Sequence, residues 1–406
     1  MIMKNAFQLL TISILIVSCV TNTEKVDYKI ETMTSPAGPK TEEPNLVLGA
    51  DGNLYMSWIE KTDSTSILNY AKFEKDGWTT PEKIAEGKDW FVNWADYPSL
   101  AVNKSGDMVA HYLQKSDSGT YTYDVKVVAK RKGDSNWSLP TKLHSDSVNA
   151  EHGFVSIQPF SNGNFFFSWL DGRNTAGAGH DHGGHGGGTM TIRGATLTPE
   201  LQKVEDTELD NRVCDCCQTS ATMVNDNPFI VYRNRSDEEI RDMYFVQKTQ
   251  DGWSQPKSVN NDNWKIAGCP VNGPRIANMQ KSIATVWFAA PEGNPRVNLA
   301  FYDEKASEFL APIVVDNTNP IGRVDIEMID SDTAVVSWLD MEEDGAKIKI
   351  AKLTKHGMLG NEVTVAQTSE SRASGFPQLV KYNSNLYLAY TEVAETSSIQ
   401  FLKIIY

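Results

Sequence analysis

Three cysteines lie within four consecutive residues of the chain, at positions 214, 216 and 217, and Cys269 follows further along. Thiolates at this spacing could hold copper(I) or zinc, because both ions favour sulfur ligands. The same residues could instead form disulfides or carry redox chemistry. Cys216 and Cys217 are neighbours, so a disulfide between these two would be strained. The spacing matches no standard zinc finger, and all three interpretations remain open.

Three histidines lie in a glycine-rich segment, residues 175–188, at positions His180, His182 and His185. Imidazoles at this spacing could wrap a transition metal without a preformed scaffold. The alternative is a solvated loop that binds metal only by chance. Catalytic ligands need rigid support, so this segment favours metal capture over catalysis. We expect copper or zinc at the cysteines and histidines, and no other cofactor.

The composition fits a globular protein that does not bind nucleic acid. Of the 406 residues, 40% are hydrophobic and 22% are charged, which excludes a disordered chain. The net charge of −14 argues against a general basic surface for nucleic acid or anionic lipid headgroups.

The first 19 residues read as a bacterial lipoprotein signal peptide. Lys4 supplies a positive charge, residues 7–17 are mostly apolar, and the string Ile-Val-Ser-Cys ends at Cys19. Cleavage before Cys19 would leave a lipidated N-terminus and a tether at residues 20–25. The alternative is an ordinary secreted protein. We expect a lipid-anchored protein of the bacterial cell envelope, at the outer membrane, facing the periplasm or the outside. The lipid would be its only contact with the membrane.

Short apolar strands that carry an aromatic residue recur along the chain. The aromatic residues are Trp58, Tyr112, Trp169, Tyr232, Trp287, Trp338 and Tyr390, at intervals of 54, 57, 63, 55, 51 and 52 residues. Four strands per unit at a period of about 50 residues are typical of propeller blades. We therefore predict an all-β fold: one monomeric β-propeller over residues 26–406, with seven blades, or six as the alternative. Residues 26–31 would complete the last blade and close the ring.

Propeller geometry brings two sets of loops to one face: the connections between blades, and the turns between second and third strands. The four cysteines after Cys19 and four of the seven histidines fall on this face. Its candidate catalytic residues are Asp96, Asp171, Arg173, Arg275, Arg323 and Arg372. Its candidate ligand-binding residues are His152, Arg212, Arg233 and Asn272. Asp171 and Arg173 could instead pair with each other across their turn.

Three turns between third and fourth strands share an Asp, a Trp and a Pro: residues 76–81, 134–140 and 251–256. These turns resemble degenerate Asp-box repeats of the sialidase-like propellers, in which the box is a structural turn. The overall pattern is similar to bacterial lipoproteins labelled exo-α-sialidase-like. The resemblance implies a glycoside hydrolase or lyase that acts on glycans.

A sialidase needs three arginines around the substrate carboxylate, a Tyr–Glu pair and an acidic Asp. The face carries enough arginines, but the family's Arg-Ile-Pro motif is absent, and Arg275-Ile276-Ala277 lies in a different repeat. No Tyr–Glu pair can be assigned, and sialidases have six blades. Our main hypothesis is an anchored propeller that binds a small molecule, glycan or metal ion at the Cys/His/Arg-rich face. The alternatives are a sialidase-like glycosidase and an interaction scaffold with disulfide-stapled loops.

Overall fold

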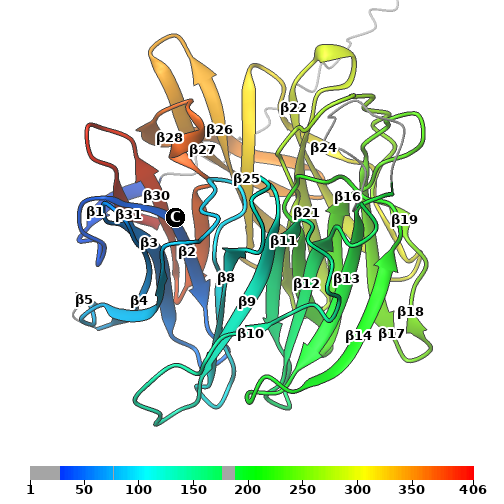
Figure 1. Cartoon of the computed structure of the whole chain (residues 1–406). Helices are drawn as coiled ribbons and strands as arrows, with labels where there is room; N and C mark the ends of the chain where they lie inside the picture. The colour runs from blue at the N-terminus through cyan, green and yellow to red at the C-terminus, as the bar shows by residue number, and fades with distance from the viewer. Residues whose placement is uncertain (1–27, 76, 176–187) are drawn as a thin grey trace, which may run out of the picture.

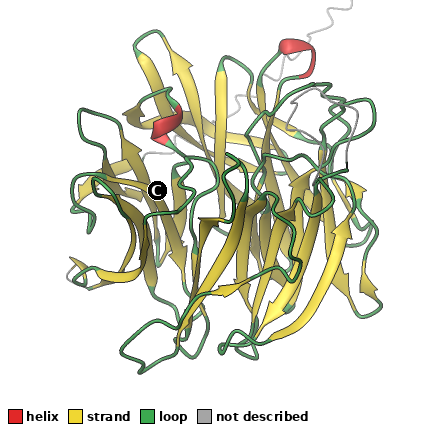
Figure 2. Cartoon of the chain, viewed as in Figure 1, coloured by secondary structure: helices red, strands yellow, loops and turns green. Residues whose placement is uncertain are grey.

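The computed structural model describes residues 28–75, 77–175 and 188–406. These residues form seven antiparallel sheets of four or five strands, arranged as the blades of one propeller (Figure 1). Strands and loops make up almost all of the described chain, with two short 3-10 helices, η1 (Pro291–Gly293) and η2 (Arg372–Ser374) (Figure 2). The predicted all-β fold with seven blades is confirmed.

The first four blades follow one another along the chain, and in each the first four strands pair in sequence order. Blade 1 comprises β2 (Thr41–Leu48), β3 (Leu54–Lys61), β4 (Ser66–Glu74), β5 (Gly77–Trp78) and β6 (Glu82–Gly87). Blade 2 comprises β7 (Leu100–Val102), β8 (Met108–Lys115), β9 (Tyr123–Lys130) and β10 (Thr141–Lys142). Blade 3 comprises β11 (His152–Pro159), β12 (Phe165–Asp171), β13 (Thr191–Leu197) and β14 (Lys203–Asp210). Blade 4 comprises β15 (Ser220–Val224), β16 (Asn227–Arg233), β17 (Met243–Thr249), β18 (Gly252–Trp253) and β19 (Lys257–Ser258).

The last three blades complete the ring, and the final one combines both ends of the described chain. Blade 5 comprises β20 (Arg275–Met279), β21 (Ser282–Ala289), β22 (Arg296–Asp303), β23 (Glu308–Phe309) and β24 (Ile313–Asp316). Blade 6 comprises β25 (Pro320–Met328), β26 (Thr333–Glu342), β27 (Gly345–Thr354) and β28 (Gly357–Thr368). Blade 7 comprises β29 (Gln378–Tyr382), β30 (Asn385–Glu392), β31 (Ser398–Ile405) and β1 (Lys29–Met33).

Strand β1 closes the ring. It pairs antiparallel with β31, from Lys29 opposite Ile405 to Met33 opposite Phe401, and the two strands lie side by side in Figure 1. Without β1, the backbone groups of β31 would form an open sheet edge. The predicted completion of the last blade by the N-terminal segment is confirmed.

The seven recurring aromatic residues all lie on the second strands of their blades, and all are buried. Buried indole and phenol groups need a hydrogen-bond partner. In blades 4, 5 and 6 that partner is an aspartate at or just after the last strand of the preceding blade. The contacts are Tyr232 Oη to Asp210 at 2.7 Å, Trp287 Nε1 to Asp262 at 2.6 Å, and Trp338 Nε1 to Asp316 at 2.7 Å. These bonds fix blades 4, 5 and 6 each to the preceding blade.

No helix in the described part of the chain is both long and apolar enough to span a membrane.

Candidate functional site

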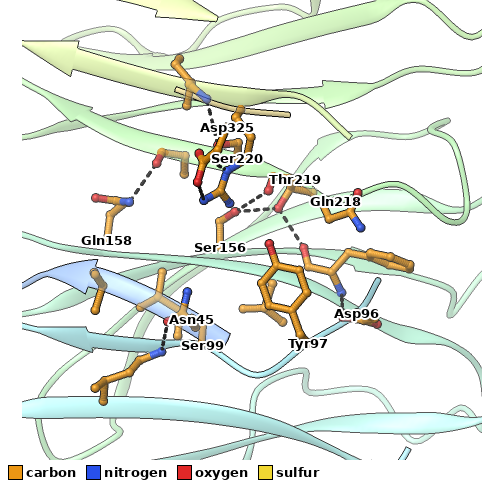
Figure 3. Close-up of a pocket in the computed structure, with 18 of the residues that line it drawn as sticks. Asn45, Asp96, Tyr97, Ser99, Ser156, Gln158, Gln218, Thr219, Ser220 and Asp325 are labelled. Carbon is orange, nitrogen blue, oxygen red and sulfur yellow. Dashed lines mark hydrogen bonds and ion pairs between the residues drawn. The ribbon is translucent and has the colours of Figure 1, made fainter. Parts of the chain in front are cut away.

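A cavity of about 160 Å³ lies where the first strands of six blades meet (Figure 3). Strands β2, β7, β11, β15, β20 and β25 each contribute to its wall. The labelled side chains are all polar: Asn45, Asp96, Tyr97, Ser99, Ser156, Gln158, Gln218, Thr219, Ser220 and Asp325. Hydroxyl and amide groups at this density suit a ligand that is rich in hydroxyl groups.

Among the described residues, Arg275 is the arginine that lines this cavity, and it forms an ion pair with Asp325. Its Nε donates to Asp325 Oδ1 at 2.9 Å, and its Nη2 lies 3.3 Å from Oδ2. Gln378 accepts from the guanidinium at 3.4 Å and donates to the Tyr97 hydroxyl at 3.3 Å. The other three candidate catalytic arginines do not line the cavity, so the described residues do not assemble a three-arginine carboxylate clamp there.

A tyrosine hydroxyl joins two carboxyl groups beside the cavity. Tyr123 Oη lies 2.9 Å from Asp96 Oδ2 and 2.9 Å from Glu151 Oε1. A hydroxyl has one hydrogen to donate, so it cannot donate to both carboxyl groups at once. A proton on one of the two carboxyls would let that group donate back to the hydroxyl oxygen. Of the two carboxyl residues, Asp96 is the one that lines the cavity.

Burial favours the protonated form of both carboxyls. Asp96 is only 2% exposed, and this desolvation raises its pKa to about 7, although the Phe154 N–H and the Tyr123 hydroxyl oppose the rise. Burial also raises the pKa of Glu151 well above its usual range. The sequence offered Asp96 as a catalytic candidate. It gave no sign that Tyr123 and Glu151 form a Tyr–Glu pair, because Tyr123 lies on β9, Glu151 lies in the connection before β11, and Tyr123 has the pattern of a core residue.

Gly153 makes room for the Asp96 carboxyl. A Cβ atom at this position would lie 1.9 Å from Asp96 Oδ2 and 3.0 Å from the Tyr123 ring. The next residue, Phe154, donates its backbone N–H to Asp96 Oδ1 at 2.7 Å. The start of β11 therefore leaves space for the Asp96 carboxyl and also orients it.

The clustered cysteines do come together in space. Cys214 Sγ lies 3.9 Å from Cys216 Sγ and 3.6 Å from Cys217 Sγ. The Cys269 thiol interacts with that of Cys216, although it comes from a different connection between blades. All four cysteines are free thiols, so the expected disulfide staples are not found among the described residues.

Charged side chains surround the thiols. Arg241 Nη1 donates to Cys214 Sγ at 3.2 Å, and its Nη2 pairs with Glu239 at 2.8 Å. Burial opposes ionisation of Cys214, yet hydrogen bonds from the neighbouring thiols and the positive charge of Arg241 hold its pKa well below the ordinary value. Arg235 bridges Glu239 and Asp215, the residue between the first two cysteines. This network pairs several of the charged residues between 235 and 241.

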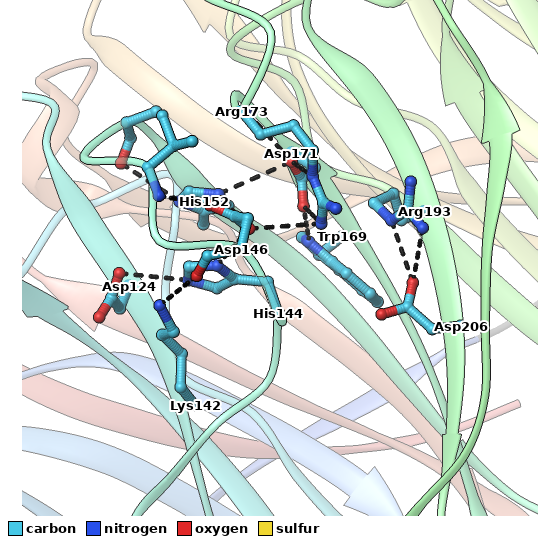
Figure 4. A network of polar contacts seen from close by, with 12 residues as sticks. Asp124, Lys142, His144, Asp146, His152, Trp169, Asp171, Arg173, Arg193 and Asp206 are labelled. Carbon is cyan, nitrogen blue, oxygen red and sulfur yellow. Dashed lines mark hydrogen bonds and ion pairs between the residues drawn. The ribbon is translucent and has the colours of Figure 1, made fainter. Parts of the chain in front are cut away.

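A second cluster combines two histidines with three aspartates (Figure 4). The His144 and His152 rings stack with their centroids 3.6 Å apart. His144 bonds Asp146 at 2.7 Å and lies 3.2 Å from Asp124. Burial lowers the pKa of His152, and the charge of His144 lowers it further. The oxygen and nitrogen atoms are close enough for a metal, but protein cations already neutralise the carboxylates.

Arg173 supplies one of those cations. It binds Asp171 through two bonds of 2.7 Å, and its Nη2 lies 3.4 Å from Asp146. Burial opposes ionisation of Asp171, yet Arg173 lowers its pKa to about 2. Lys126 pairs with Asp124 at 3.1 Å. Asp171 and Arg173 therefore pair with each other, and both lie with His152 in an internal ion network outside the cavity.

The remaining candidate residues hold neighbouring loops in place through hydrogen bonds and ion pairs. Arg233 is buried and donates to the backbone carbonyls of residues 241, 272 and 288. Asn272 Oδ1 accepts the Arg323 N–H at 2.8 Å. Arg323 donates to residues 370–375, and its guanidinium lies 4.8 Å from the Trp94 ring centroid. Arg372 is exposed beside the same ring, and Arg212 pairs with Asp237.

The candidate ligands His180, His182 and His185, and the lipidation residue Cys19, lie outside the described residues.

No family model matches the chain, and no curated protein matches it. Several solved structures share its fold. The polysaccharide lyase Uly1 aligns with a TM-score of 0.52 and 9% identity, over 87% of this chain and 88% of its own. An α-L-arabinofuranosidase of family GH93 from Fusarium graminearum, in complex with arabinobiose, aligns with a TM-score of 0.49 and 13% identity, over 90% and 92%. A protein of unknown function from Dyadobacter fermentans aligns with a TM-score of 0.48 and 10% identity, over 76% and 94%. At these identities the likeness establishes the propeller fold alone.

Proposed function

We propose that this protein cleaves a glycosidic bond in a glycan, and that the cavity on the propeller axis is its active site. The observation that carries the proposal is the Tyr123 hydroxyl between the Asp96 and Glu151 carboxyls. This arrangement favours a protonated carboxyl, and burial, which raises the pKa of Asp96 to about 7, supports Asp96 as the proton donor at the cavity wall. A carboxyl of this kind is the usual proton donor in glycoside cleavage.

In the proposed reaction, Asp96 donates its proton to the glycosidic oxygen as the bond from that oxygen to the sugar carbon breaks. A water molecule bonds to that carbon, and its proton passes to a carboxylate on the opposite side. Tyr123 is fully buried and acts as a positioning residue that holds Asp96 and connects it to Glu151. Asp325, ion-paired with Arg275, is a second carboxyl on the same wall. It is the candidate for the carboxylate that acts on the opposite side of the bond.

The cavity favours a single sugar unit. Its volume of about 160 Å³ is below the roughly 300–1,000 Å³ that is usual for pockets that enclose larger ligands. We therefore propose that the terminal unit of a glycan enters it. The fold of the polysaccharide lyase Uly1 is consistent with this class of substrate. Because Arg275 is already paired with Asp325, the site is not proposed as a sialidase site with three arginines.

A substrate panel tests the proposal. Purified full-length protein is incubated with chromogenic glycosides of neutral, uronic and sialic sugars, and with acidic polysaccharides assayed for new reducing ends and for unsaturated products. We expect turnover of at least one substrate class by the wild type and its loss in Asp96→Asn. The matched control is Asp63→Asn, since the Asp63 side chain is fully exposed. Turnover that survives unchanged in Asp96→Asn, or no turnover across the panel, would contradict the proposal.

A further inference from the structure

The three clustered thiols have the spacing of metal ligands. Two of their sulfur–sulfur distances are 3.6 and 3.9 Å, and all three sulfurs lie within 4.8 Å of one another. A tetrahedral site with metal–sulfur bonds of about 2.3 Å separates its sulfurs by about 3.8 Å. A disulfide would instead bring two sulfurs to about 2.05 Å. The thiols therefore already stand at the distances that a bound ion would require.

The backbone holds the cluster in place. Cys214 donates its N–H to the Arg233 carbonyl at 2.9 Å, and the preceding Val213 donates to the Met190 carbonyl at 2.9 Å. After the cluster, the Gln218 side chain bonds Ala95 O at 2.7 Å and Gly273 N at 2.8 Å. Blades 3 and 4 and two other connections between blades thus anchor this one loop. A rigid loop loses little conformational freedom when it binds an ion.

Two buried guanidinium groups compensate the negative charge that thiolates would bring. Arg241 is 3% exposed and bonds Cys214 Sγ directly. Arg233 is 2% exposed and donates to the Arg241 backbone carbonyl at 2.7 Å. Hydrogen-bond partners outside the ligands orient those ligands at metal sites.

We propose that Cys214, Cys216 and Cys217 bind one thiophilic metal ion, zinc(II) or copper(I), and that Cys269 supplies a fourth sulfur from the neighbouring connection. Cys214 and Cys217 are buried, whereas Cys216 is half-buried and Cys269 is exposed. The ion would therefore enter from the Cys269 side. Binding would also tie the connection before blade 4 to the connection before blade 5.

The test uses full-length protein without an affinity tag and with His180, His182 and His185 replaced by alanine. This background removes the second group of possible ligands. Reduced, metal-free protein is titrated without oxygen, with zinc(II) against a chromogenic zinc chelator and with copper(I) against a copper(I) chelator. We expect one equivalent per chain of at least one ion. Cys216→Ser should weaken that binding at least about 100-fold, since losing a ligand exceeds the 10–100-fold effect of losing an outer partner. The ion bound more strongly identifies the physiological candidate.

Two controls keep the result interpretable. Glu238→Gln changes an exposed charge near the cluster and should leave the affinity unchanged. Alkylation followed by mass spectrometry needs no substitution: in wild-type protein, metal should protect the three thiols from modification. Binding that Cys216→Ser does not weaken, thiols that metal does not protect, or a disulfide among these cysteines in protein purified without oxygen would each overturn the proposal.

Discussion

At the scale of single residues, the proposed activity depends on one carboxyl that keeps its proton. Asp96 is held by a backbone N–H and a tyrosine hydroxyl and is almost completely buried. The sequence indicated Asp96 because its loop lies on the face where connections between blades gather. It could not indicate Tyr123, since an aromatic residue in a strand is usually a core residue. Hydrogen bonds between different blades have no signature in local sequence.

Gly153 should not tolerate a larger side chain. Alanine here would place Cβ 1.9 Å from Asp96 Oδ2, so the carboxyl must move. We expect a loss of stability of about 1–3 kcal/mol from overpacking. A displaced proton donor should also lower kcat/KM by about 100-fold. Gly38→Ala is the control, because nothing lies within 4 Å of its Cβ position. Full activity in Gly153→Ala would show that the Asp96 position is not critical.

Asp96 should also make stability depend on pH. Burial raises its pKa to about 7 in the folded protein, compared with about 3.9 in an unfolded chain. Between these values the folded state binds more protons, so this contribution to the free energy of unfolding is complete below pH 4 and is lost as pH rises through 7. The change is on the order of 4 kcal/mol. Urea unfolding at several pH values should show this decline in the wild type and a smaller one in Asp96→Asn. Parallel curves for the two proteins would rule out a raised pKa.

At the scale of elements, the repeat could be predicted from the sequence because each blade needs the same set of strands and buried aromatic residues. The buried aromatic residues of the second strands recur at nearly constant intervals, and their positions predicted seven blades correctly. The completion of blade 7 by β1 was also predicted, because the last repeat of the sequence lacks a fourth strand. The paired aspartates were not predicted, because Asp210, Asp262 and Asp316 are common turn residues until the structure shows what they bind. The His-rich segment lies between β12 and β13 in the chain, as its long interval indicated.

Asp262 should be essential to the junction between blades 4 and 5. It accepts the Trp287 indole N–H at 2.6 Å and pairs with Arg296 at 2.8 Å. Asp262→Ala would leave the buried indole without a partner, which costs about 1–3 kcal/mol. Urea unfolding measures the loss, with Asp63→Ala as the exposed control. Stability equal to that of the control would mean that this contact does not join the blades.

At the scale of the whole molecule, the ring brings distant parts of the chain to one axis. The cavity takes residues from six first strands, and the thiol cluster takes cysteines from two connections between blades. The sequence predicted that such loops would meet, and it singled out the cysteines. It could not distinguish arginines that face a ligand from arginines that hold loops. Arg233 and Arg323 bind backbone carbonyls instead, a role that depends on the paths of neighbouring loops.

The lipid anchor remains a prediction for the whole molecule. If Cys19 is lipidated, the wild-type protein should fractionate with membranes and be released by detergent but not by high salt. Cys19→Ser should block lipidation and move the mature protein to the soluble fraction. Cys269→Ser is the matched control and should stay with the membranes. Equal membrane association of wild type and Cys19→Ser would contradict an anchor at this residue.

The most direct measurement is the pH dependence of kcat/KM on a glycan substrate, for wild type and Asp96→Asn. The profile of kcat/KM reports the ionisation of the free enzyme. With a proton donor whose pKa is about 7, wild-type kcat/KM should fall as the pH rises above 7. Asp96→Asn should lose this alkaline limb and about 10²–10⁴-fold of its activity. An unchanged alkaline limb in Asp96→Asn, at wild-type activity, would show that the proton comes from elsewhere and that this cavity is not the active site.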